Sequence, residues 1–439
     1  MKNRILSKFD FILIACVLIL TSIGITFIYS SGINSDGILV SNEYIKQSIW
    51  TGIGLVIMLS VALIDYRKIY RYTPYLFAAA LAVLVYTRFF GRYVNGARSW
   101  IGIGDLGIQP SEITKIIFIL FLASFLDKNY NENQRKRFFF SLLILILPMG
   151  IILLQPDLGT ASVFLPIFIF MCFMANVPVR YIMIVILSGF LTIFFTVLPI
   201  WETEIYHGSI PIIRALTNFR LRMLIIAASL AVTVAGILGQ FFFKKKYFYW
   251  ITYVFGIISF SLLASAGAGK VLKPYQIRRL IVFIDPSSDP RGAGWNIIQS
   301  KIAIGSGLLR GRGFMQGTQS HYRFLPHQST YFIFSIFAEE TGFIGGILLF
   351  AVFFCILFRI VYIMKQTTNR FGYLIASGIL GLFFFHFIVN VGMVMGIMPI
   401  TGIPLPFLSY GGSALLTNML AVGILMSINN RRLDFKVAL

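Results

Sequence analysis

The sequence predicts an all-α, polytopic integral membrane protein with about twelve transmembrane helices. Of its 439 residues, 58% are hydrophobic and only 12% are charged, whereas a soluble domain averages about 25% charged residues. The hydrophobic residues form runs close to the roughly 20 residues that a spanning helix needs. This composition excludes a disordered chain, a coiled coil, a soluble core and a nucleic-acid-binding protein.

Twelve apolar runs are the candidate spans. They cover residues 11–29, 49–64, 75–90, 113–126, 138–154, 161–175, 181–200, 223–243, 247–266, 332–358, 373–398 and 414–428. Several runs are short, and their helices are expected to extend into flanking residues. No small-residue cleavage site follows the first run, so it is expected to remain as an uncleaved span.

Basic residues predict the orientation of the chain. The net charge is +21, from 37 Lys and Arg against 16 Asp and Glu. Basic clusters lie on every second connection: Lys2, Arg4 and Lys8; Arg67, Lys68 and Arg71; residues 135–137; residues 244–246; and Arg431, Arg432 and Lys436. Because basic loops remain in the cytoplasm, both termini are expected to be cytoplasmic.

Residues 267–330 are expected to form one long loop on the outer side of the membrane, before the tenth span. Against Asp285 and Asp289 it carries nine basic residues: Lys270, Lys273, Arg278, Arg279, Arg291, Lys301, Arg310, Arg312 and Arg323. Long loops escape the positive-inside rule, so the predicted orientation stands. The cations form either a solvated basic loop or a site for an anionic, phosphorylated lipid headgroup.

Three other outer connections hold polar residues that could contact a substrate. Trp100 follows a Gly-rich stretch and is either an interfacial anchor or a substrate contact. Glu112 and Lys115 are three residues apart and share a helix face near the bilayer, as a structural ion pair or as a functional pair. Asp157 lies in a tight turn, where it either caps the next helix or contacts substrate.

Residues 402–412 are too rich in Pro and Gly for a lipid-facing helix. Such backbone must be buried in protein or line an aqueous cavity. Glu339 and Glu340 are adjacent in the tenth span, so at most one is expected to face a given cavity. The four histidines form no metal-binding spacing and no Gly-rich nucleotide loop is present, which argues against an ATP-driven pump.

A series of short motifs occurs in order along the chain. They are residues 109–113 (QPSEI), 155–160 (QPDLGT), 275–279 (YQIRR), 285–286 (DP), 299–307 (QSKIAIGSG), 310–313 (RGRG), 317–320 (GTQS) and 404–413 (PLPFLSYGGS). Together they resemble the SEDS family (shape, elongation, division and sporulation) over nearly the whole chain. The motif at 317–320 favours its RodA-like elongation branch.

The resemblance implies a peptidoglycan glycosyltransferase in the bacterial cytoplasmic (inner) membrane. It would join lipid II disaccharides into glycan strands on the outer face during cell elongation and shape maintenance. Its expected partners are lipid II, a class B penicillin-binding transpeptidase and the elongation machinery, with no nucleic acid. No cofactor is certain, although a divalent cation could assist the leaving group.

The chemistry implied by the resemblance needs a base for the attacking sugar hydroxyl and cations for the departing pyrophosphate. Arg is suited to bidentate phosphate contacts. The residues expected to bind substrate are Trp100, Asp157, Arg278, Arg279, Lys301, Arg310, Arg312 and Ser409.

The chain departs from the family pattern in two ways. The family has ten spans, and residues 202–267 add a helical pair to the single membrane domain at 1–439. The family's catalytic Asp aligns with Tyr331, and its Glu and His align with His327 and Ser329. A phenol with an ordinary pKa of about 10 is a poor general base. Glu112, with Lys115 as its partner, is therefore the preferred substitute, and Tyr331 marks the family's catalytic position.

Two alternative functions stay open. The changes at positions 327, 329 and 331 fit a catalytically silent SEDS scaffold that binds lipid II and the transpeptidase. The many spans, with Glu112 and Lys115 near the midplane, fit a transporter of lipid-linked precursors.

Overall fold

The computed structural model describes residues 9–94, 96–102, 107–206, 208, 210–271, 274–290, 292–322 and 324–432. It contains two compact units: unit 1 comprises Met1–Val177 with Asn296–Leu439, and unit 2 comprises Pro178–Trp295. Several basic residues of the sequence analysis lie outside the described residues: Lys2, Arg4, Lys8, Lys273, Arg291, Arg323 and Lys436.

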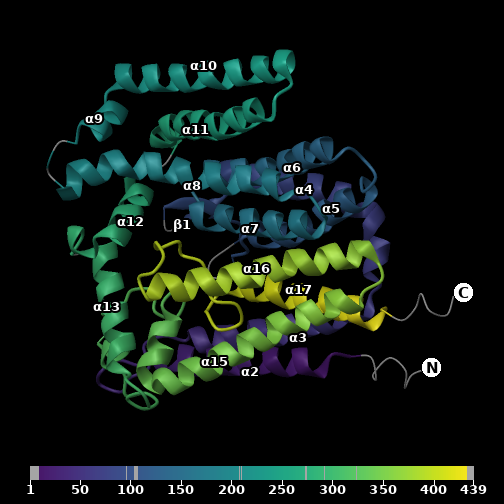
Figure 1. Cartoon of the computed structure of the whole chain (residues 1–439). Coiled ribbons are helices and arrows are strands. Elements are labelled where there is room, and N and C mark those ends of the chain that lie inside the picture. Colours follow the sequence, from purple (N-terminus) through teal and green to yellow (C-terminus); the bar gives the residue numbers. More distant parts are fainter. Residues whose placement is uncertain are drawn as a thin grey trace, which may run out of the picture. The chain divides into compact units, whose positions relative to one another are not determined.

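Unit 1 is a bundle of helices with one small hairpin (Figure 1). Its elements are α2 (Phe11–Ser31), α3 (Glu43–Leu63), η1 (Tyr66–Tyr72), α4 (Thr73–Phe90), β1 (Arg92–Val94), β2 (Ala97–Trp100), α5 (Pro110–Lys128), α6 (Gln134–Leu154), α7 (Leu158–Met174), α13 (Ala293–Ser306), α14 (Thr318–His321), α15 (Ile333–Gln366), α16 (Arg370–Val394) and α17 (Gly412–Asn430). β1 and β2 pair antiparallel.

The predicted all-α, polytopic fold is confirmed, and a helix covers all or most of each of the twelve predicted runs; the largest difference is at 373–398, where α16 ends at Val394. Among the described residues, ten helices are long and apolar enough to cross a membrane. The other two are α7, which is shorter, and α5, which contains Glu112, Lys115, Asp127 and Lys128. The count of twelve spans therefore stays a prediction.

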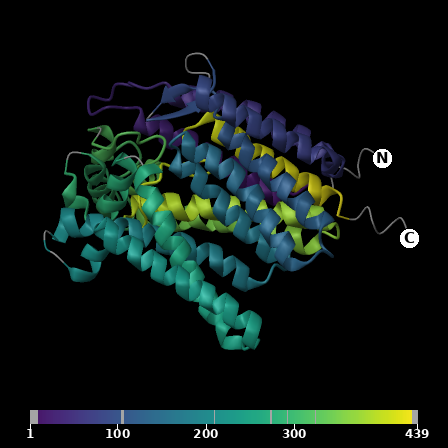
Figure 2. The same cartoon turned by 90° about the horizontal axis from the view of Figure 1, so that it is seen from above.

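Helices α16 and α17 form the centre of unit 1 (Figures 1 and 2). α16 packs against α7, α15 and α5, while α17 packs along α3. Close approach of α17 to α3 requires Gly423, because a Cβ there would lie 2.7 Å from the carbonyl oxygen of Met58. Small residues are the usual means of bringing membrane helices together.

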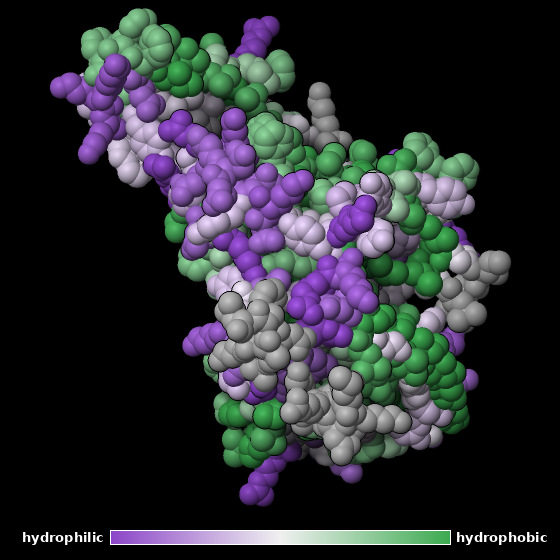
Figure 3. All heavy atoms as spheres, turned by 90° about the vertical axis from the view of Figure 1, so that its right-hand side faces the viewer, coloured by the Kyte–Doolittle hydropathy of each residue, from purple (hydrophilic) through white to green (hydrophobic). Residues whose placement is uncertain are grey.

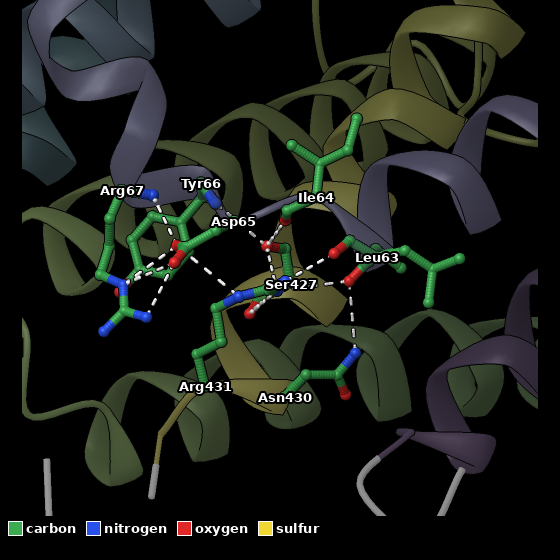
Figure 4. Close-up of polar contacts among 9 residues, drawn as sticks. Leu63, Ile64, Asp65, Tyr66, Arg67, Ser427, Asn430 and Arg431 are labelled. Atoms are coloured by element: carbon green, nitrogen blue, oxygen red, sulfur yellow. Dashed lines mark hydrogen bonds and ion pairs between the residues drawn. The ribbon is translucent and has the colours of Figure 1, made fainter. Parts of the chain in front are cut away.

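Lys68, Arg71, Arg135 and Lys136 are exposed at the end of unit 1 that holds η1 and the start of α6. Figure 3 faces this side of the molecule and shows hydrophilic surface interspersed with hydrophobic surface. At this end Asp65 ties the turn after α3 to the last turn of α17 (Figure 4). Its carboxylate lies 2.8 Å from Arg67 and 3.6 Å from Arg431.

Burial by itself would raise the pKa of the Asp65 carboxyl. The hydrogen bonds from Arg67 and the charges of Arg67 and Arg431 outweigh that effect, so the pKa is lowered. Asp65 is therefore held as a charged tie between the two helix ends.

Unit 2 contains α8 (Val179–Trp201), η2 (Glu202–Tyr206), α9 (Pro211–Thr217), α10 (Phe219–Phe243), α11 (Lys246–Val271), α12 (Pro274–Ile284) and η3 (Pro286–Ser288). α10 packs on α11, and α11 packs on α8. Hydroxyl contacts join them: the Ser259 and Ser229 oxygens are 3.0 Å apart, and Ser261 donates to the carbonyl of Ser188. The predicted helical pair therefore exists as α10 and α11, and the assignment of 202–267 as an insertion stays a prediction.

The segment 267–330 is more ordered than a simple loop. It contains α12, η3, α13 and α14, and α11 extends into it as far as Val271. Apolar residues at Ile277, Leu280, Ile281 and Ile284 recur at helical spacing and account for α12. Arg278 and Arg279 interrupt this apolar pattern, which is why the sequence favours a loop here.

Candidate functional site

The connections at the other end of unit 1 meet to form the candidate site. Their described parts are residues 32–42, 91–94, 96–102, 107–109, 155–157, 307–322, 324–332 and 395–411. Long-range hydrogen bonds join them: Gln328 donates to the carbonyl of Ser31, Tyr410 N–H donates to the carbonyl of Ser329, and Gln109 N–H donates to Ser413.

The Pro- and Gly-rich connection at 402–411 is buried in protein, as predicted. Gln47 donates to the carbonyl of Ser409 (3.1 Å) and accepts from the N–H of Gly411 (3.2 Å). Asn390 on α16 donates both to the carbonyl of Ile403 (2.8 Å) and to that of Tyr331 (3.1 Å). These side chains satisfy backbone groups that lipid could not.

Glu112 and Lys115 form an ion pair inside the bundle. Their charged atoms are 2.8 Å apart, and the residues are only 5% and 1% exposed. The Lys115 Nζ also lies 3.4 Å from Nε2 of His386, whose Nδ1 lies 3.1 Å from the carbonyl oxygen of Pro404. Because Nδ1 must carry the proton for that contact, Nε2 is free to accept from Lys115. The pair therefore connects α5 through α16 to the 402–411 connection.

Asp157 caps the N-terminus of α7. This is one of the two roles that its place in a tight turn suggested. Its carboxylate accepts from the backbone N–H of Thr160 (3.0 Å), the Thr160 hydroxyl (2.8 Å) and Gln109 Nε2 (2.9 Å). Ser409 likewise serves the local backbone, since its hydroxyl accepts from Leu405 N–H at 2.8 Å. Trp100 is half-buried in β2 with its ring against Gly107. Substrate contacts by Trp100, Asp157 and Ser409 remain predictions.

The basic residues of unit 1 at this end are accessible. Lys301, Arg310 and Arg312 are exposed. Within the part of the chain that the structure describes, no ion pair engages these three side chains. In unit 2, Arg278 is exposed and Arg279 lies over the ring of Tyr275 at 5.6 Å. Exposed cations without acidic partners are suited to bind an anion.

Two buried glutamates hold the backbone that carries Arg310 and Arg312. Glu339 accepts from the N–H of Gln319 and Glu340 accepts from the N–H of Met315, both at 3.0 Å. Their backbone carbonyls accept from the N–H groups of Arg312 and Gly313. The two carboxylates point to different parts of the segment, because adjacent residues on a helix project in different directions. Both accept hydrogen bonds from backbone N–H groups of the loop, and neither is paired with a cation in the described residues.

A polar pocket of about 330 Å³ lies beside the stretch that immediately precedes Tyr331. It is lined by Ser31, Val40, Ser41, Glu43 and residues 325–330. Tyr331 itself is half-buried next to this stretch, with its ring in edge contact with the ring of His327 at 6.0 Å. The pocket volume is at the lower end of the range for small-molecule binding sites.

Sequence reasoning missed several residues of this end: Gln47, Glu43, Gln328, His386 and Asn390. Gln328 lies within the stretch that aligns with the family pattern at 327, 329 and 331, where it matches none of the pattern's polar positions. The other four are single polar residues within ordinary helices, with no motif around them. These residues make their contacts only because the fold brings together segments that are distant in the sequence. Burial of His386 within a span was the one signal in the sequence that could have pointed to it.

Among the described residues, no group of three or more His, Cys, Asp or Glu is placed to hold a metal ion. The exposed cations of this end repel a divalent cation rather than ligate it. The described residues of this end therefore do not fit a resident metal site.

Within the described part of the chain, buried polar contacts, ten long apolar helices and exposed cations define a multi-pass membrane protein with a polar site at one end of unit 1. The chain belongs to the cell cycle protein family of FtsW, RodA and SpoVE, whose family model matches residues 10–239 and 222–433.

Curated relatives agree with this assignment. The chain is 52% identical over 436 residues to "Peptidoglycan glycosyltransferase RodA" of Treponema pallidum, covering 99% of this chain and 100% of the relative. It is 34% identical to "Peptidoglycan glycosyltransferase MrdB" of Escherichia coli K12, over 86% of this chain and 83% of the relative.

Solved structures support the fold. A chain from a study of "polymerization and crosslinking by a peptidoglycan synthase complex" matches with a TM-score of 0.67 and 23% identity, covering 97% of this chain and 98% of that one. RodA of Thermus thermophilus matches with a TM-score of 0.59 and 20% identity, covering 97% of each chain.

Proposed function

We propose that this protein is a peptidoglycan glycosyltransferase that polymerises lipid II into glycan strands during cell elongation. The observation that carries the proposal is identity of 52% over the full length of a relative named for that activity. The exposed cations at one end of the bundle support it, because the leaving group of this reaction is a pyrophosphate.

In the proposed reaction, a sugar hydroxyl attacks the anomeric carbon of a lipid-pyrophosphate-linked sugar. The bond from that carbon to the pyrophosphate oxygen breaks, and the polyprenyl pyrophosphate leaves with the electron pair. Arg310 and Arg312, with Lys301, would bind the phosphates and stabilise the charge that develops there. Arg278 and Arg279 are proposed as further phosphate contacts, and Trp100, Asp157 and Ser409 as contacts to the rest of the substrate.

The proposed setting is the bacterial inner membrane, with both termini in the cytoplasm and residues 267–330 outside. The basic residues exposed in η1 and at the start of α6 support this orientation. A class B penicillin-binding transpeptidase and the elongation machinery are proposed as partners, supported by the likeness to a chain of a peptidoglycan synthase complex.

A silent scaffold is the competing function, because the position of the family's carboxylate holds Tyr331. Purified protein with its transpeptidase partner and fluorescent lipid II separates the two. We expect a glycan ladder from the natural protein. A ladder that forms only after Tyr331→Asp would overturn the proposal and identify a scaffold that binds lipid II without turnover.

Reversing the charge of Arg310 should weaken lipid II capture about tenfold or more, because a charge-assisted hydrogen bond contributes about 1.5–3 kcal/mol. Lys245→Glu is the matched control, since Lys245 is exposed in the predicted cytoplasmic turn. Binding to nanodiscs with labelled lipid II measures both. Equal losses in the two variants would indicate a general effect of charge instead of a phosphate site.

A further inference from the structure

Glu43 is the one carboxylate among the residues that line the pocket beside Tyr331. It occupies the first turn of α3 and is half-buried. In the described part of the chain, its side chain has no ion-pair partner. By contrast, the carboxylates of Glu112 and Asp157 are engaged by Lys115 and by the start of α7. Glu43 is therefore available to a ligand in this pocket.

Gln328 supplies an independent sign of a ligand in the same pocket. Its side-chain amide donates to the carbonyl of Ser31, so its oxygen is the atom that must find another donor. That oxygen is buried without a partner, and the residue is only 9% exposed. A buried acceptor left unpaired costs about 1–3 kcal/mol. A hydroxyl or N–H group of a ligand would satisfy it.

The backbone holds this part of the pocket in a costly conformation. His327 has a φ of 51°, in the left-handed region that residues other than glycine rarely adopt. Its carbonyl accepts from the N–H groups of both Thr330 and Tyr331 at 3.1 Å. This tight turn places Gln328 against α2 and the pocket between α2 and α3. Strain of this kind, about 1–3 kcal/mol, is concentrated at functional sites.

We propose that this pocket binds the acceptor sugar and that Glu43 is the general base of the reaction. This inference rests on the proposed function. Glu43 replaces the carboxylate that the family carries at the position of Tyr331. As the acceptor hydroxyl oxygen bonds to the anomeric carbon, its proton moves to the Glu43 carboxylate, and the pyrophosphate leaves with its electron pair. Gln328 accepts a hydrogen bond from the acceptor sugar and orients it.

Glu112 is the competing base. A carboxylate that is 5% exposed and paired with Lys115 at 2.8 Å is shielded from an incoming sugar, so the helices around it would have to rearrange to admit the acceptor. Glu43 needs no such rearrangement. The two assignments predict different variants to be inactive, so one assay decides between them.

The test is polymerisation of fluorescent lipid II by the full-length protein with its transpeptidase partner. Glu43→Gln should reduce the initial rate at least 100-fold, in line with the usual loss of a general base, and should leave lipid II binding within about twofold. Asp36→Asn is the matched control: this carboxylate is exposed in the same α2–α3 connection and lies outside the pocket. It should retain the full rate.

A second variant separates chemistry from folding. If Glu43 stands in for the missing family carboxylate, adding Tyr331→Asp to Glu43→Gln should restore the rate at least tenfold. A purely structural Glu43 would not be rescued in this way. The inference is overturned if Glu43→Gln polymerises at the natural rate, or if it is inactive and Tyr331→Asp restores nothing. A natural protein that makes no ladder would instead overturn the proposed function.

Discussion

Replacing Lys115 with methionine should destabilise the protein by about 3–5 kcal/mol, the usual cost of breaking a buried ion pair. The variant leaves the Glu112 carboxylate without its cation, at a position that is only 5% exposed. It also removes the contact to His386 and so weakens the connection from α5 to α16. Thermal unfolding of the detergent-purified protein, followed by its helical signal, measures the loss.

The double variant Glu112→Gln with Lys115→Met is the matched control. Two neutral side chains of similar volume need no charge compensation, so most of the lost stability should return. Equal losses in the single and double variants would contradict the ion-pair explanation. The same double variant decides the role of the pair: polymerisation by a stable double variant would assign it to structure, and its absence would assign it to catalysis.

Replacing Gly342 with alanine should abolish or strongly reduce polymerisation while the helices remain. Gly342 interrupts α15 with a φ of 69° and a ψ of −164°, a conformation open almost only to glycine. A Cβ there would lie 2.2 Å from the backbone nitrogen of Gly311, next to Arg310. The segment that carries Arg310 and Arg312 would have to move, and we expect at least a tenfold loss of lipid II capture.

Gly346→Ala provides the control in the same helix. No atom lies within 4 Å of a Cβ at that position, and alanine is a better helix former than glycine. This variant should be active and as stable as the natural protein, or slightly more so. Similar losses of capture in both variants would show that the kink does not position the cations.

The membrane character and most helices were predictable because the cost of transferring a side chain into lipid depends mainly on the residue itself. Apolar runs such as 414–428 therefore identified α17, and Pro and Gly at 402–412 identified buried irregular backbone. The capping role of Asp157 was predictable because it depends only on the residues next to it in the chain. The segment 267–330 was harder, since the apolar face of α12 is short and its arginines conceal the helical spacing.

The candidate site was predictable only in part. The motifs located its loops, and the basic residues among them indicated an anion. The sequence by itself thus determined a membrane-spanning chain of this family with a cationic segment before α15. Tertiary structure alone brought Glu43 from the start of α3 to the stretch that contains Gln328, and placed His386 beside Lys115. These contacts join residues that are distant in the chain, and they depend on how helices pack rather than on any local pattern.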